Sequence, residues 1–204
     1  MALFGRNAAQ LDGRTKTASA ASHRLTLDLS RAETLATMLA HSRASSVVEV
    51  ADLVAGMFLY GWDRLSRYWE SDDQERVEVV LRKMCQISPQ RWNYWIQFYD
   101  TNRRTKEKIA ALPRILQKFQ TTPASEPPLK RSAELAATFK RAEEMAPLRD
   151  TSGGRSVPIL TSECVLLCIV RNRGVEIGRK LAASGMNVPQ LEKDALSSRR
   201  APRA

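Results

Sequence analysis

Two cysteines of the 204-residue chain lie four residues apart, in one of its most apolar segments. Residues i and i+4 share a face of a helix, so Cys164 and Cys168 have a spacing that suits two ligands of one metal ion. A metal ion needs further donors, and residues 159–196 contain no histidine. Free cysteine is among the most frequently buried residues, which favours packing over a metal or redox site. We therefore predict that both cysteines belong to the core and that the chain holds no metal ion.

The remaining reactive side chains form no recognisable catalytic arrangement. The two histidines are His23 and His41, and a catalytic nucleophile needs such a base within hydrogen-bond reach. His41 is expected near the C-terminal end of a helix, where a positive charge is favourable. Glu143 and Glu144 are adjacent, so they point apart on a helix. The sequence predicts no catalytic residues and no cofactor, hence a protein that is not an enzyme.

The net charge of +10 suggests nucleic-acid binding if the basic residues cluster on a folded surface. Residues 1–24 and 197–204 are basic and lack apolar periodicity, so we interpret both as flexible tails. The body also has an acidic stretch at residues 70–78. A local basic cluster at residues 103–108 is equally typical of a solvated helix face.

Cysteine content and hydropathy predict the compartment. Three cysteines form no even disulfide framework, which favours a reducing environment. No apolar segment reaches the length of a membrane span, and no hydrophobic region resembles that of a signal peptide. We predict a cytoplasmic protein without a membrane partner. Residues 1–24 also have the composition of an organelle transit peptide, so import is an alternative.

Apolar residues recur every three or four positions, which predicts helices almost throughout. One helix, residues 132–146, is expected to end before Pro147. The next, residues 161–171, is apolar nearly all round and is therefore expected in the middle of a helical bundle. Either Thr161 or Ser162 is suited to cap its N-terminal end.

Two shorter helices are predicted to follow. Gly174 is expected to end the buried helix, because glycine tolerates a left-handed conformation. A helix over residues 175–184 is then closed by Gly185. Asn187 can cap a last helix, whose first turn accommodates Pro189 without loss of a hydrogen bond.

The second half of the chain has a partner earlier in the sequence. A shift of 106 residues aligns residues 29–40 with residues 135–146, and a shift of 112 aligns "DLVAGMF" with "CVLLCIV". The six-residue difference falls in the loop between the two helices, where insertions are tolerated. Glu33 departs from the pattern, because the second copy has Phe139 there. The pattern predicts an internal repeat.

These residues resemble the Clp amino-terminal repeat of the Clp/Hsp100 chaperones. The second copy carries the family's succession of features in "FKRAEEMA", "ILTSECVLLCIV", "RGVEIGRKLAASGMNV" and "LEKDAL". Cys164 stands where the family usually has histidine, and Asp52 takes that place in the first copy. The resemblance covers residues 129–196 and, more weakly, residues 25–70. It implies a compact pseudo-symmetric all-helical domain that serves adaptor docking, substrate capture or regulation. No G-x-x-x-x-G-K-[ST] phosphate loop occurs, so such a chain would act by binding.

Five aromatic residues fall within eight positions in the segment "WNYWIQFY". Trp92, Trp95 and Tyr99 lie on one helical stripe, which is typical of a core plug. The alternative is a surface that binds a partner or stacks on bases, with Arg103 and Arg104 close by. We expect mostly buried rings with one exposed edge. The candidate partner-binding residues are Trp92, Trp95, Tyr99, Arg103 and Arg104. The two tryptophans at the end of the first copy are expected to pack against these rings.

The predicted fold class is all-α, with two pseudo-repeated helical motifs that form a compact bundle and a helical insertion between them. We predict a basic tail over residues 1–24, a first Clp-like repeat over 25–70 and an aromatic helical insertion over 71–119. A proline-rich linker over 120–128, a second Clp-like repeat over 129–196 and a basic tail over 197–204 follow. We predict a non-enzymatic, chaperone-associated adaptor or regulator whose partner is another protein, such as a Clp-type ATPase or another large machine. The alternatives are a basic helical nucleic-acid-binding protein and an inactive relic of a Clp protein.

Overall fold

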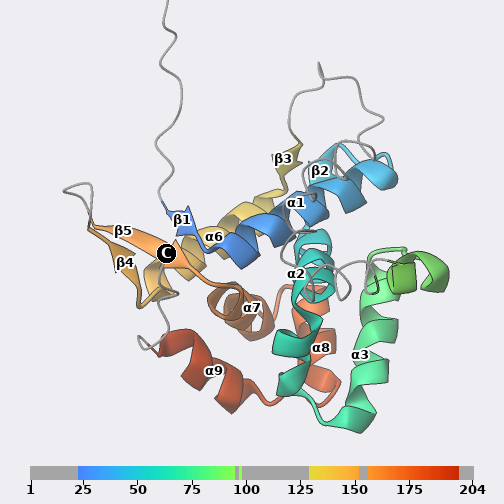
Figure 1. Cartoon of the computed structure of the whole chain (residues 1–204). Helices are drawn as coiled ribbons and strands as arrows, with labels where there is room; N and C mark the ends of the chain where they lie inside the picture. The colour runs from blue at the N-terminus through green and yellow to red at the C-terminus, as the bar shows by residue number, and fades with distance from the viewer. Residues whose placement is uncertain (1–22, 95–96, 98–128, 152–155, 198–204) are drawn as a thin grey trace, which may run out of the picture.

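The structure is a computed structural model that describes residues 23–94, 97, 129–151 and 156–197 (Figure 1). These residues are mostly helical, and their strands are only two to four residues long. The predicted all-α class is confirmed at this coarse level. Within the described residues, no helix is both long and apolar enough to cross a membrane.

The first described part of the chain contains three α-helices. Its elements are β1 (Arg24–Leu25), α1 (Leu27–Ser42), β2 (Val47–Val48), α2 (Val50–Leu65), the short 3-10 helix η1 (Ser66–Tyr68) and α3 (Ser71–Met84). Residues 89–94 are also helical. The described part begins at His23, and Arg24, the last residue of the predicted N-terminal tail, already belongs to β1.

The second described part contains four α-helices. Its elements are β3 (Lys130–Arg131), α6 (Ala133–Met145), β4 (Arg149–Asp150), β5 (Val157–Leu160), α7 (Ser162–Arg171), α8 (Glu176–Ala183) and α9 (Val188–Leu196). These helices agree with the predicted ranges to within one or two residues.

Helices α2 and α7 lie at the centre, and the other helices pack around them (Figure 1). Every residue from Cys164 to Val170 is buried, as the apolar sequence of this segment predicts. Helix α7 contacts α2, α6, α8 and α9, while α2 contacts α1, α3 and η1. The predicted central position of residues 161–171 is confirmed.

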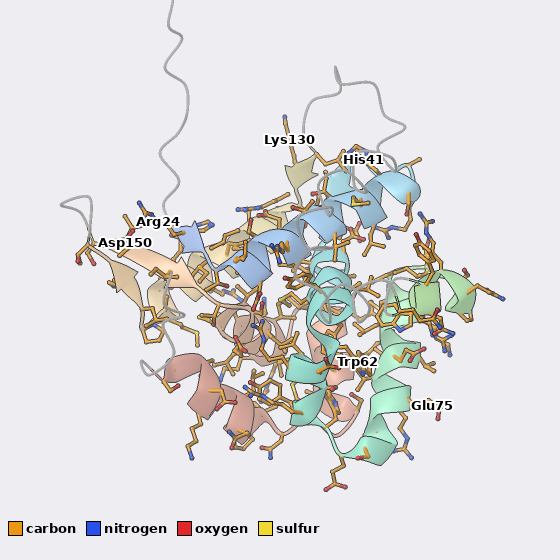
Figure 2. The ribbon with its side chains drawn as sticks, in the orientation of Figure 1. Arg24, His41, Trp62, Glu75, Lys130 and Asp150 are labelled. Atoms are coloured by element: carbon orange, nitrogen blue, oxygen red, sulfur yellow. The ribbon has the colours of Figure 1, made fainter. Side chains whose placement is uncertain are left out.

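The short strands join the two halves of the chain. Strand β1 pairs in parallel with β5, which pairs antiparallel with β4, while β2 pairs in parallel with β3. An ion pair between Arg24 and Asp150 links the two outer strands of the three-stranded sheet (Figure 2). Each half therefore supplies a strand to a loop of the other half.

Helix N-termini follow the predicted capping chemistry. The side chains of Ser132, Thr161 and Asn187 accept hydrogen bonds from backbone N–H groups of the first turns of α6, α7 and α9. Between the two candidates for capping α7, Thr161 is the cap. Pro189 lies in the first turn of α9, as predicted.

Helix C-termini depart from the prediction in one place. Gly185 follows α8 with a φ of 90°, as expected, but Gly174 is not left-handed. Helix α7 ends instead at an extended Asn172, whose side-chain oxygen accepts a hydrogen bond of 3.1 Å from the Gly174 amide. Ala44 and Gln86, which carry side chains, are left-handed after α1 and α3. The expectation for Gly174 was wrong, because an Asx-type hydrogen bond turns the chain there.

Candidate partner-binding site

The aromatic segment begins with a well-defined helical turn. The Ser88 Oγ accepts a hydrogen bond of 3.3 Å from the Arg91 amide, and the Ser88 carbonyl accepts one of 2.9 Å from the Trp92 amide. Pro89 follows this cap, at a position where a missing amide hydrogen costs nothing. The local sequence therefore fixes the start of the helix at residues 89–94.

Trp92 anchors this helix to the core of the protein. Its side chain is 0% exposed and belongs to the same apolar cluster as the central helices. The indole N–H is buried without a hydrogen-bond partner. Because a fully covered ring cannot meet a partner, Trp92 is a core residue rather than a contact residue. The other four candidates, Trp95, Tyr99, Arg103 and Arg104, lie outside the described residues.

Arg91 and Tyr94 occupy the exposed face of the same helix. Tyr94 is 47% exposed, which makes it one of the three most exposed large hydrophobic side chains within the described part of the chain. Arg91 is exposed beside it. Tyrosine and arginine are the residue types that most often carry binding energy at protein interfaces. The described part of the candidate site therefore consists of Arg91 and Tyr94, which are not among the five residues predicted from the sequence.

The tryptophans of the first half form a separate aromatic cluster. Both Trp62 (Figure 2) and Trp69 contact the Phe58 ring, at centroid distances of 5.9 and 5.5 Å. The Trp69 indole N–H also donates a hydrogen bond of 3.0 Å to the Ser184 Oγ. Phe58 is the ring partner of both tryptophans within the described residues, and most rings of the aromatic segment, against which they were expected to pack, lie outside those residues.

The charges of the folded body nearly cancel. The described residues include 19 of the 32 Lys and Arg residues and 18 of the 22 Asp and Glu residues, a net charge of +1. The other residues therefore carry +9 of the total +10. A nucleic-acid-binding surface needs clustered basic residues, so the described body is a poor candidate for one.

Two groups of ion pairs fasten the second half of the chain to the first. Arg64 pairs with both Asp28 and Glu163, so it links α2 to α1 and α7. The Asp194 carboxylate of α9 accepts hydrogen bonds of 2.7 Å from Arg67 and 3.0 Å from the Tyr68 hydroxyl. Burial raises the pKa of Tyr68 to about 12, so this hydroxyl remains a donor at neutral pH. These side chains hold elements together.

A buried ion pair closes the loop between α1 and α2. Both Arg43 hydrogen bonds, of 2.6 and 2.8 Å, go to the carboxylate of Asp52, which is 0% exposed. The same carboxylate accepts the Glu49 amide at 2.9 Å and so caps the helix. Desolvation raises the pKa of Asp52, against the opposing effects of these hydrogen bonds. The Arg43–Asp52 ion pair therefore has a structural role, at the loop between α1 and α2.

All three cysteines are free and buried. The thiol of Cys85 donates a 3.0 Å hydrogen bond to the Ala51 carbonyl, and burial raises its pKa to about 12. Cys164 and Cys168 are 0% and 4% exposed, so their predicted burial is confirmed. Across the described ranges, no three side chains among His, Cys, Asp and Glu converge on a metal-binding position.

Within the described residues, the exposed face of residues 89–94 is the part of the predicted partner-binding segment that is open to contact with a partner. Comparisons with protein-family models, curated proteins and solved structures found no match for this chain.

Proposed function

We propose that the chain is a non-enzymatic protein-binding module, an adaptor or regulator, built on two divergent repeats of the Clp amino-terminal type. The pairing of the strands supports the double repeat. The resemblance and the distribution of charge support a binding role.

The register of the strands is the observation that carries the double repeat. Arg24 of β1 pairs with Ile159 of β5, and Lys130 of β3 pairs with Val47 of β2. The shift of 106 residues aligns Arg24 with Lys130, and the shift of 112 residues aligns Val47 with Ile159. The two parallel pairs are therefore equivalent under the same two shifts that align the helices. Unrelated segments would have no reason to share this register, so the equivalence supports an internal repeat.

The helix starts follow the same rule. Thr26 precedes α1 and Ser132 precedes α6, which are positions 106 residues apart. The Thr26 amide donates a 3.0 Å hydrogen bond to the Leu160 carbonyl, and the Ser132 amide donates one of 2.9 Å to the Val48 carbonyl. Leu160 and Val48 are 112 residues apart. This pair of hydrogen bonds supports the proposed repeat independently of the side chains.

The binding role rests on the resemblance and on the charge of the described body. In the Clp chaperones this domain serves docking and regulation, and the described body is almost neutral, which favours a protein partner over nucleic acid. We propose a Clp-type ATPase or another large machine as that partner. The three free thiols favour a reducing compartment such as the cytoplasm.

Photo-crosslinking tests the proposal at the exposed helix face. A photoreactive amino acid replaces Tyr94 in the full chain, and the crosslinked species from a lysate of the source organism are identified by mass spectrometry. The same substitution at Lys193, which is exposed on α9 at the opposite side of the molecule, serves as the matched control (Figure 1). We expect one protein species crosslinked from position 94 and not from position 193.

Affinity measurements with the purified partner then quantify the site. Arg91→Ala and Tyr94→Ala should each weaken binding by about 5- to 30-fold, the range of an interface residue worth about 1 to 2 kcal/mol. Lys193→Ala should have no effect. Crosslinks to nucleic acid alone, with binding that collapses between about 50 and about 200 mM salt, would instead support the nucleic-acid alternative.

A further inference from the structure

The structure brings a third sulfur atom to the two cysteines of α7. The Cys168 Sγ lies 3.4 Å from the Sδ of Met145, which is the last residue of α6. Cys164 lies one turn before Cys168 on the same helix face, and its thiol donates a 3.6 Å hydrogen bond to the carbonyl of Ala142, about one turn before Met145 in α6. The sequence places Met145 nineteen residues before Cys164, so their proximity depends on the packing of α6 against α7.

We propose that Cys164, Cys168 and Met145 form a binding site for one Cu(I) ion. Two thiolates and one thioether are a soft donor set of the kind that selects Cu(I) over harder ions. Zn(II) favours four ligands in a tetrahedron, and the cluster has three sulfur donors and no imidazole. With metal–sulfur bonds of about 2.3 Å, three ligands in a plane lie about 4 Å from one another. The Cys168 Sγ and the Met145 Sδ, which are 3.4 Å apart, need only a small adjustment to share an ion.

The surroundings suit the charge of the loaded site. On binding Cu(I), each cysteine releases its thiol proton to solvent, and Met145 binds as a neutral thioether. Two thiolates and one monovalent cation leave one net negative charge. Arg141 of α6 and Arg171 at the end of α7 place positive charge near Cys168. These charges offset part of the negative charge of the loaded site.

Access and rigidity also fit a binding site. Cys168 is 4% exposed, while Met145 is partly exposed at the end of α6, so an ion can enter beside the methionine. The backbone of both cysteines is held in the central helix α7, whose first turn is capped by Thr161. A rigid helix keeps two ligands one turn apart, and the flexible methionine side chain closes the third side.

The chain supplies its own controls. Met84 and Cys85 are a second methionine and cysteine, at the end of α3, and neither belongs to the cluster. Met84 Sδ is contacted by the Lys180 ammonium at 3.3 Å, and Cys85 is hydrogen-bonded to the Ala51 carbonyl. Met84→Leu and Cys85→Ser therefore remove the same atom types elsewhere in the fold.

Titration of the reduced full chain with Cu(I), supplied under anaerobic conditions as its bicinchoninate complex, tests the proposal. The wild type should remove one Cu(I) per chain from the chelator, with a new near-ultraviolet thiolate-to-copper absorption. Cys164→Ser and Cys168→Ser should each abolish stoichiometric binding. Met145→Leu should weaken it by about tenfold or more, equivalent to about 1.4 kcal/mol. Both control variants should bind as the wild type does.

A wild-type chain that takes up no Cu(I) from the chelator would overturn the proposal, because sulfur atoms that only pack give burial without affinity. Equal loss of binding in the control variants, or stoichiometric Zn(II) uptake in preference to Cu(I), would overturn it as well. Circular dichroism of every variant shows whether it is folded. If the serine variants are not, the nearly isosteric Met145→Leu and the rise in melting temperature of the wild type with Cu(I) decide the question.

Discussion

Gly56 is a position where a single added methyl group should strongly destabilise the fold. A Cβ atom on Gly56 of α2 would lie 2.3 Å from the carbonyl oxygen of Ala32 in α1, whereas ordinary van der Waals contact begins at 3.4 Å. The Cβ atom would be fixed to the α2 backbone and the oxygen belongs to the α1 backbone, so no flexible side chain can move aside. The two helices would have to separate by about 1 Å along their most extensive contact.

The magnitude follows from two opposing effects. Overpacking in a tight core costs about 3 kcal/mol at the upper end of its usual range. Replacing glycine with alanine inside a helix returns about 1 kcal/mol. We expect Gly56→Ala to lower the free energy of unfolding by about 2 kcal/mol. For a chain of this size, that corresponds to a fall in melting temperature of about 4 to 8 °C.

Gly61 provides the matched control within the same helix. A Cβ atom there would meet only the Leu65 side chain, at 3.9 Å, and its φ of −123° is open to alanine. We expect Gly61→Ala to change the free energy of unfolding by less than about 1 kcal/mol. Thermal and urea denaturation, followed by far-ultraviolet circular dichroism, measure both variants. If Gly56→Ala and Gly61→Ala melt at the same temperature, the close approach of α1 and α2 is not what restricts position 56.

Other positions offer further tests of the fold. Asp52→Ala should lower the free energy of unfolding by about 3 to 5 kcal/mol in urea denaturation, because it leaves Arg43 without its carboxylate in a mostly buried position. Gln86→Gly should raise it by about 0.5 to 1 kcal/mol, because glycine adopts the φ of 54° without strain, and an unchanged urea midpoint would contradict this. Burial raises the pKa of Cys85 to about 12, so the unfolded chain releases this proton at lower pH than the folded one, and stability should fall between about pH 9 and about pH 12. Cys85→Ala should lose less stability over that range, as measured by the urea midpoint against pH.

The sequence predicted the parts of the fold that depend on local chemistry. Pro147, Thr161 and Asn187 mark helix boundaries, because capping and the lack of a proline amide act within a few residues. The burial of Cys164 to Val170 followed from a segment that is apolar all round. The left-handed Ala44 and Gln86 could not be predicted, because neither is a glycine and the strain is accepted to close a helix end.

The candidate site was less predictable, because it depends on contacts between distant segments. The aromatic stripe correctly suggested burial for Trp92, but its exposed neighbour Tyr94 lies on the other face of the turn. Only the structure shows which face meets the core. The third sulfur of the proposed copper site was likewise hidden, since nothing in the spacing of Met145 relates it to Cys168.

The exchange of strands explains why the two halves of the chain depend on each other. Strand β1 of the first half completes a sheet with β5, and β3 of the second half pairs with β2. Strands of two residues have little stability alone, so each needs the other half to hold its partner in place. The contact between α2 and α7 and the hydrogen bonds to Asp194 join the halves a second time. A sequence change in one half is therefore transmitted to the packing of the other. The ion pair between Glu33 of α1 and Arg131 of β3 is a further link of this kind, because removing either charge leaves the other half with an unpaired partner.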